Sequence, residues 1–267
     1  MTSPPSPVIG NWLIDGLPGP DRTRLIALGN WQDLQFGEIL AEPGMSLPFA
    51  VFPISGMLSL TDVGNPGRSL VLDLIGREGM LGTSLSLDMA RATLRATVLG
   101  VGSAWRIEAR LLIELLRIES PLTRSLQRYL NYRMGQLALG ARCASFHPVE
   151  TRLARWLLAC QDRMGGESLQ LTHDLLAQTL GVRRSTITLA AIALQKRGVL
   201  SYSRGEIQLR SRAGLEKAAC SCHGHASASY RRCLLKPPAR WSKSSRRSHI
   251  RRLRAGCGIR TAGSGPG

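Results

Sequence analysis

Apolar residues between positions 172 and 196 recur at helical spacing in two short runs that are separated by a glycine. We expect the first helix to begin after Thr172, because its hydroxyl can accept a hydrogen bond from a free backbone N–H. Gly181 then permits a sharp turn at little steric cost. The second predicted helix runs from about Arg183 to Lys196. Its predicted inward face consists of Ile187, Ala190, Ala191 and Leu194.

Two β-prone runs follow these helices, on either side of Ser203-Arg204-Gly205. A short polar turn with glycine between two such runs indicates a β-hairpin. Helix, turn, helix and hairpin together predict a winged helix-turn-helix. The alternative is an ordinary pair of amphipathic helices in an all-α core. It does not account for small Ala177, Gly181, the paired arginines and the hairpin occurring together.

The chain before this segment changes from a strand pattern to a helix pattern. Between residues 31 and 106, short alternating or apolar runs are separated by turns such as Asn65-Pro66-Gly67, which predicts a compact antiparallel roll or barrel. A helical pattern begins at Ala109, and Ser120-Pro121 marks the start of a long helix. The apolar positions of that helix are Leu122, Leu126, Tyr129, Leu130, Met134, Leu137 and Ala141.

This predicted helix has about 25 residues and would measure nearly 40 Å at about 1.5 Å per residue. A dimer seam would explain the length, and packing of the helix on its own β-roll is the alternative. His147-Pro148 ends the helix, and another amphipathic helix follows. We therefore predict an α+β protein with an N-terminal antiparallel β-roll of the cupin-like jelly-roll type. Its predicted parts are an N-terminal segment (1–24), the roll (25–110), a helical linker with a dimerisation helix (111–146), a winged helix-turn-helix (147–217) and a disordered basic tail (218–267).

Composition is that of a globular protein, with 267 residues of which 43% are hydrophobic. No uninterrupted apolar run approaches the roughly 18 residues of a membrane span, and the first ten residues lack the features of a signal peptide. We expect a cytoplasmic protein that does not bind membranes. The six cysteines are unevenly spaced, which is typical of a reducing compartment rather than of a disulfide framework.

Charge is concentrated at the C-terminal end. Eleven of the 35 Lys and Arg residues, and none of the 18 Asp and Glu residues, lie from Arg231 onward. The first 230 residues therefore carry 24 basic and 18 acidic side chains, a net charge of +6, against +17 for the whole chain. The tail is either a non-specific attractor of phosphates or an extension without a role. We base no function on it.

The order of these elements resembles the Crp/Fnr family of bacterial transcription regulators over roughly residues 25–217. The most specific part is LTHDLLAQTLGVRRSTIT, and the turn phrases FGEILAEPG and REGMLG support it. The resemblance implies that the long helix pairs two subunits and that the β-roll holds an effector. It further implies a homodimer that binds double-stranded DNA and is not an enzyme, with RNA polymerase as a candidate partner.

The resemblance places Thr172, Arg183 and Thr186 against DNA phosphates and lets Arg184 read a guanine edge. The chemistry agrees, since hydroxyls and helix N-termini suit phosphate oxygens and an arginine fork suits guanine O6 and N7. The full predicted base-reading set, which faces outward near the start of the second helix, is Arg184, Ser185, Thr188 and Leu189. Arg204 and Arg210 of the hairpin are expected near phosphates.

Two of these positions depart from the family pattern. Ser185 stands where a glutamate often accepts from cytosine, and Leu189 stands where a second base-reading arginine often lies. The DNA sequence that the family's best-known members recognise therefore cannot be carried over. A leucine at position 189 can contact a thymine methyl group instead.

The effector is not identified by the sequence. Cyclic-nucleotide members of the family hold the ribose with a glutamate after a glycine, whereas here Met80 follows Gly79 and cannot accept the ribose hydroxyls. Arg91 and Arg95 are each followed by alanine where a small hydroxyl residue is needed, so we interpret them as surface charges. No cysteine or histidine precedes Cys143, which argues against an iron–sulfur cluster or a haem in the roll. We predict no cofactor.

Cys220-Ser-Cys222-His223-Gly-His225 contains metal-ligating residue types, but adjacent Cys222 and His223 would not easily reach one ion. We interpret this stretch as a frayed helix end and predict no metal site.

An enzyme would need a catalytic set, and the N-terminal region offers carboxylates without histidine or cysteine partners. The remaining alternative is a non-specific nucleic-acid-binding protein driven by its basic surface and tail. Deletion after Ser229 would abolish nucleic-acid binding if the tail drives it, but would scarcely alter the DNA sequence selected by a helix-turn-helix regulator.

Overall fold

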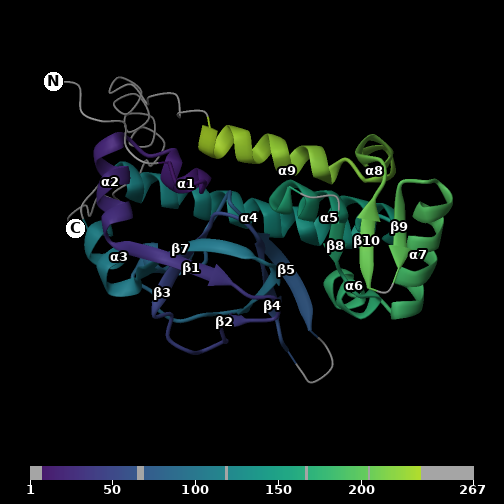
Figure 1. Ribbon diagram of the computed structural model, residues 1–267, viewed down its shortest axis with the longest axis horizontal. Helices are drawn as coiled ribbons and strands as arrows, with labels where there is room; N and C mark the ends of the chain where they lie inside the picture. Colours follow the sequence, from purple (N-terminus) through teal and green to yellow (C-terminus); the bar gives the residue numbers. More distant parts are fainter. Residues whose placement is uncertain (1–7, 65–68, 118–119, 166–167, 204, 236–267) are drawn as a thin grey trace, which may run out of the picture. The chain divides into compact units, whose positions relative to one another are not determined.

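The computed structural model of the chain describes residues 8–64, 69–117, 120–165, 168–203 and 205–235 (Figure 1). The helices are α1 (Trp12–Asp15), α2 (Gly19–Ala27), α3 (Ala109–Leu116), α4 (Pro121–Phe146), α5 (Val149–Met164), α6 (His173–Leu180), α7 (Arg184–Lys196), α8 (Arg212–Ala218) and α9 (Cys222–Tyr230). The strands are β1 (Gly29–Leu34), β2 (Ile39–Ala41), β3 (Phe49–Pro53), β4 (Met57–Asp62), β5 (Leu70–Ile75), β6 (Arg95–Gly100), β7 (Gly102–Glu108), β8 (Ser168–Gln170), β9 (Leu200–Ser203) and β10 (Glu206–Leu209).

Strands β1 to β7 form the predicted antiparallel roll. One sheet has the order β1-β7-β3 and the other the order β2-β6-β4-β5. Alternate residues of the strands point between the sheets, where Leu58, Ile75 and Val98 are fully buried in one apolar cluster. The predicted fold class, an α+β protein with an N-terminal antiparallel roll and a C-terminal helix-turn-helix, is confirmed.

The N-terminal segment is more structured than its sequence indicated, because it contains α1 and α2. Asn11 caps α1 by accepting from the backbone N–H groups of Leu13 and Ile14. The Asn11 side-chain amide also donates to the carbonyls of Pro53, at 2.8 Å, and Gly79, at 2.9 Å. This completely buried asparagine therefore fastens the first helix to the roll.

Helix α4 begins where the sequence predicted, with Ser120 as N-cap and Pro121 in the first turn. It has 26 residues and ends at the predicted break, where His147 adopts an extended conformation. Its predicted apolar positions are not all buried. Leu122, Leu126 and Tyr129 in the first half of the helix are buried, whereas Met134 and Leu137 further along are 64% and 40% exposed.

The C-terminal end of the described chain corrects one expectation. Residues 218–235, which we assigned to a disordered tail, are folded, and α9 packs against α4 and α5. Cys222 and Tyr230 of α9 are buried, so the stretch around Cys220 is not a frayed helix end. A deletion after Ser229 would remove Tyr230 from the core and could not serve as the clean test that the sequence suggested. The residues from 236 onward lie outside the described part of the chain.

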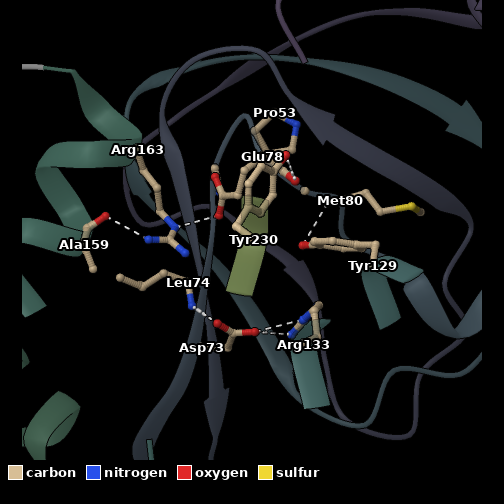
Figure 2. A network of polar contacts seen from close by, with 12 residues as sticks. Pro53, Asp73, Leu74, Glu78, Met80, Tyr129, Arg133, Ala159, Arg163 and Tyr230 are labelled. Atoms are coloured by element: carbon tan, nitrogen blue, oxygen red, sulfur yellow. Dashed lines mark hydrogen bonds and ion pairs between the residues drawn. The ribbon is translucent and has the colours of Figure 1, made fainter. Parts of the chain in front are cut away.

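Two ion pairs link the roll to the helices around it (Figure 2). Arg133 of α4 contacts Asp73 of β5 at 2.8 Å, and Arg163 of α5 contacts Glu78 at 2.8 Å. All four side chains are at most 14% exposed. Arg163 also donates to the carbonyl of Ala159, at 2.9 Å. The roll is therefore joined to α5, the first helix of the C-terminal region, by charge as well as by packing.

Tyrosines extend the same network (Figure 2). The hydroxyl of Tyr129 accepts from the backbone N–H of Met80, at 3.3 Å, and the hydroxyl of Tyr230 donates to the carbonyl of Glu78, at 3.4 Å. Burial raises the pKa of Tyr129 and of Tyr230 well above the ordinary value, and it raises the pKa of Tyr132 between them to about 12. These phenols stay neutral hydrogen-bonding groups at physiological pH.

The C-terminal region has its own core, to which α5 to α8 and β8 to β10 contribute. Leu157, Leu176, Ile187 and Leu194 are fully buried in it. Met57, Leu74 and Leu99 of the roll join the same cluster, so the two regions share one apolar contact. None of the helices in the described ranges is long and apolar enough to cross a membrane.

Candidate nucleic-acid interface

Helices α6 and α7 have the geometry that the sequence predicted. The Thr172 hydroxyl caps α6 by accepting from the N–H of Leu175, at 3.2 Å. Gly181 then adopts a left-handed conformation with φ 62°, which a side chain rarely tolerates. Arg183 is the N-cap residue of α7. The four predicted inward residues, Ile187, Ala190, Ala191 and Leu194, are all buried.

The opposite face of α7 is free near its N-terminus. Arg183, Arg184 and Ser185 are exposed, and Leu189, one turn further on, is 69% exposed. Thr186 is half-buried. The positive charge of the two arginines and the positive end of the helix dipole therefore coincide at the start of α7, which is an arrangement that attracts phosphate.

Thr188 has a partner that the sequence did not reveal. Its hydroxyl lies 3.0 Å from Nδ1 of His173 and donates to the carbonyl of Arg184, at 3.2 Å. The His173 ring stacks on Tyr202 of β9, with ring centroids 4.2 Å apart. Burial lowers the pKa of His173, and the nearby Arg184 guanidinium lowers it further. A neutral imidazole thus connects α6, α7 and β9.

Arg184 has a local partner as well. Its Nε lies 3.6 Å from Oδ1 of Asp174 in α6, and both side chains are more than 60% exposed. An exposed pair of this kind contributes only about 0.2–1 kcal/mol. The guanidinium is therefore held near the outer face of α7 but can exchange this carboxylate for another acceptor at little cost.

Strands β9 and β10 form the predicted hairpin, with Glu206 paired to Ser203 across the turn. Arg204, which we expected near phosphate, lies outside the described residues. Arg210 is exposed at the end of β10 and donates to the Ser201 hydroxyl, at 3.1 Å. Strand β8 pairs with β10 and completes a three-stranded sheet. Strand β8 was not predicted from the sequence, because it has only three residues and follows a pair of glycines.

The positions compared with a cyclic-nucleotide site are occupied by packing or by surface contacts. Met80 is completely buried, and a side chain at Gly79 would collide with the Tyr129 hydroxyl. Arg91 is exposed and donates to the carbonyl of Gly44, at 2.7 Å, while Arg95 pairs with Glu42, at 3.0 Å. A cavity of about 950 Å³ lies outside the roll, where residues of β5, α4, α5 and α9 line it.

The stretch from Cys220 to His225 does not gather around one point. His223 faces Asp162, with Nε2 3.7 Å from Oδ2, and His225 is exposed. Cys220 and Cys222 point instead toward the end of α4. Adjacent Cys222 and His223 therefore face different partners, and the partner of Cys222 comes from a distant part of the chain.

Comparisons with known proteins agree with this geometry. Residues 151–218 match the Crp-like helix-turn-helix domain, which includes α6, α7 and the hairpin. Comparison with curated proteins finds no match.

Solved structures share the architecture. A Crp/Fnr-family transcriptional regulator from Eubacterium rectale is 21% identical, with a TM-score of 0.62 over 77% of this chain and 96% of the other. FixK2 from Bradyrhizobium japonicum is 15% identical, with a TM-score of 0.62 over 72% of this chain and 98% of the other. The c-di-GMP-responsive regulator CLP from Xanthomonas campestris is 18% identical, with a TM-score of 0.58 over 73% of this chain and 100% of the other.

At these identities the structural likeness shows the fold, and the domain match identifies the C-terminal region. Two of these similar proteins are described as a transcriptional regulator and as a global regulator of gene expression. The chain therefore combines a Crp-like helix-turn-helix, which is a DNA-binding domain, with the fold of the Crp/Fnr transcription regulators.

Proposed function

We propose that this protein is a homodimeric, sequence-specific transcription regulator that reads an inverted DNA repeat with α7. The observation that carries the proposal is the exposed N-terminal face of α7, which presents Arg183, Arg184, Ser185 and Leu189 on a helix whose other face is buried. A recognition helix of this length and exposure suits the major groove of B-DNA.

Within this proposal the exposed residues have distinct roles. Arg184 reads a guanine after releasing Asp174, and Leu189 contacts a thymine methyl group. Ser185 contacts an adjacent base edge. Thr188 lies at the rim of this surface with its hydroxyl bonded to His173, so it orients α7 and contacts bases mainly through its methyl group.

Phosphate contacts surround the base-reading residues. Arg183 is exposed at the start of α7 and Arg210 is exposed directly after β10, while Thr172 and Thr186 offer hydroxyls at the starts of α6 and α7. We include Arg204 in the same group because it falls between β9 and β10 in the sequence. These contacts set affinity and orientation, because phosphates carry no direct sequence information.

The outer face of α4 supports the dimer. Leu130, Met134, Leu137 and Ala141 follow one another at spacings of three and four residues, and Met134 and Leu137 remain exposed. An apolar stripe of this kind, continued in a second copy, forms a helical seam. Two-fold symmetry then places the two α7 helices on half-sites about one helical turn apart.

In this proposal an unidentified effector binds the β-roll and regulates DNA binding by α7. RNA polymerase is the candidate partner for activation. Because chromosomal DNA is the proposed ligand, we propose the cytoplasm as the location. The second candidate function is non-specific binding to nucleic acid, which the concentration of basic residues from Arg231 onward favours.

Selection of bound sequences from a random duplex library distinguishes these functions. The full chain and a variant that ends at Leu235 are compared at about 0.15 M salt. The cut at Leu235 keeps the buried Tyr230 and removes nine of the eleven basic residues from Arg231 onward. We expect both proteins to enrich the same palindrome, with half-sites about one turn apart.

Loss of all binding in the shortened variant, with no enriched motif in the full chain, would show that the tail drives a non-specific interaction. A motif without two-fold symmetry would contradict the dimer.

A further inference from the structure

Four metal-ligating side chains meet at the end of α4. Cys143 and His147 come from its last turn and its C-terminal cap, one helical turn apart. Cys220 and Cys222 come from the link between α8 and α9. One ligand atom from each of the four residues lies within 4.8 Å of every other. Residues separated by more than seventy positions in the sequence thus converge on one point.

Two opposite edges of this cluster have the length expected of a small coordination tetrahedron. The Sγ atoms of Cys143 and Cys220 are 3.5 Å apart, and Sγ of Cys222 is 3.6 Å from Nδ1 of His147. A tetrahedral Zn²⁺ with Zn–S bonds of about 2.3 Å and Zn–N bonds of about 2.0–2.1 Å separates its ligand atoms by about 3.5–3.8 Å. One ion at the centre would reach all four atoms with small side-chain movements.

We propose that Cys143, His147, Cys220 and Cys222 form a structural Zn²⁺ site. Three thiolates and one imidazole are a ligand set that tetrahedral structural zinc uses, and they fill all four positions. Cys143 and Cys222 are almost completely buried, which suits a closed site without a water ligand.

The location gives the site a mechanical consequence. His147 lies at the break between α4 and α5, where the helix that precedes the DNA-binding domain ends. The two other cysteines follow α8, the last helix of the matched domain. Zinc therefore ties both ends of the DNA-binding domain to the end of α4 and fixes the start of α9. This role holds whether or not the protein regulates transcription.

Metal content of the full chain tests the site directly. The protein is purified under reducing conditions from zinc-supplemented cells, and zinc is measured by mass spectrometry. We expect about one zinc per chain, because one ion satisfies all four ligands. Replacement of zinc by Co²⁺ should give the intense visible bands of a tetrahedral site and the charge-transfer absorption of cobalt–thiolate bonds. These spectra report coordination without any substitution.

Matched variants identify the ligands. Cys143→Ser, Cys220→Ser and His147→Gln should each lose zinc or bind it much more weakly, with altered cobalt spectra. Cys233→Ser serves as the cysteine control, because Cys233 lies outside the cluster. His223→Gln and His225→Gln are the histidine controls and should retain a full complement of zinc.

Several outcomes would overturn the proposal. These are a wild-type chain without zinc or cobalt bands, zinc that persists in Cys143→Ser and Cys220→Ser, and loss of zinc in the His223→Gln control. A disulfide between Cys143 and Cys220 in protein from reducing cells would also contradict it, and so would bound iron with sulfide in place of zinc. Because the cobalt spectrum is taken on the unaltered chain, misfolding of a variant cannot decide the question.

Discussion

Individual side chains on α7 have different roles in the proposed DNA interface. Arg184 combines high exposure with a weak hold on Asp174, so it is available to a base without a large desolvation cost. Arg183, beside it, is the N-cap residue of the helix and has an exposed side chain. The two arginines are adjacent in sequence, and their substitution should nevertheless have different effects.

Arg184→Ala should relax discrimination at one base pair of each half-site, by about 1–3 kcal/mol. Arg183→Ala is the control and should weaken binding to all sequences alike, with a shallower salt dependence. Binding is measured against the selected palindrome and its single-base variants. Unchanged discrimination in Arg184→Ala would refute its base-reading role.

His173 gives the domain a pH response. Its pKa is lower in the folded protein than the ordinary value of 6.5, so the unfolded chain binds protons more readily. The free energy of unfolding should therefore fall as the pH drops below about 6.5. His173→Gln should make this fall less steep in denaturant titrations, whereas His225→Gln, at an exposed site, should not. An equal slope in wild type and His173→Gln would contradict this explanation.

At the scale of elements, the turn between α6 and α7 depends on a backbone that only glycine adopts easily. Gly181 has a φ of 62°, which residues with a side chain rarely adopt, and a Cβ atom added there would lie 3.3 Å from the Leu70 side chain of the roll. Gly181→Ala should cost about 1 kcal/mol or more of unfolding free energy. Gly224→Ala, in an open helical position of α9, should instead be neutral or stabilising by up to about 1 kcal/mol. Chemical denaturation of both variants tests this, and equal effects would contradict it.

Helix α4 carries two apolar surfaces. The first packs on the roll, and the second, around Leu137, is exposed and forms the seam of the proposed dimer. Leu137→Glu should shift the protein from dimer to monomer and lower its affinity for the palindrome, because a carboxylate would be buried in the seam. Mass is measured by light scattering, with Ala213→Glu at an exposed position of α8 as control. A dimer that survives Leu137→Glu would place the seam elsewhere.

The elements also show what a sequence can predict. Both ends of α4 and the C-terminal end of α6 were predictable because Ser120, His147 and Gly181 cap the helices that they border. The apolar face of α7 follows from spacing alone. The second role of Thr188 depends on His173, fifteen residues away, and on a ring in β9, and no local pattern reveals such a contact. The cluster around Cys143 was not predicted for the same reason, because Cys220 and Cys222 follow the whole helix-turn-helix domain in the sequence.

At the scale of the molecule, the buried pair Glu78–Arg163 connects the roll to the DNA-binding domain (Figure 2). Glu78→Gln leaves a buried guanidinium without its counter-charge and should cost about 3–5 kcal/mol of unfolding free energy. The double variant Glu78→Gln with Arg163→Met should be less destabilised than the sum of the two single variants. Strictly additive effects in denaturant titrations would show that the pair does not interact.

The last described helix has a consequence for how the chain is made. Trp12 of α1 lies 5.5 Å from Tyr230, centroid to centroid, and Tyr230 also packs on Tyr132. During synthesis the N-terminal region emerges first, yet a ring in its core is supplied by one of the last described residues. The roll can collapse early, but its finished packing must wait until Tyr230 has left the ribosome. Premature termination would therefore damage the first part of the protein as well as the last.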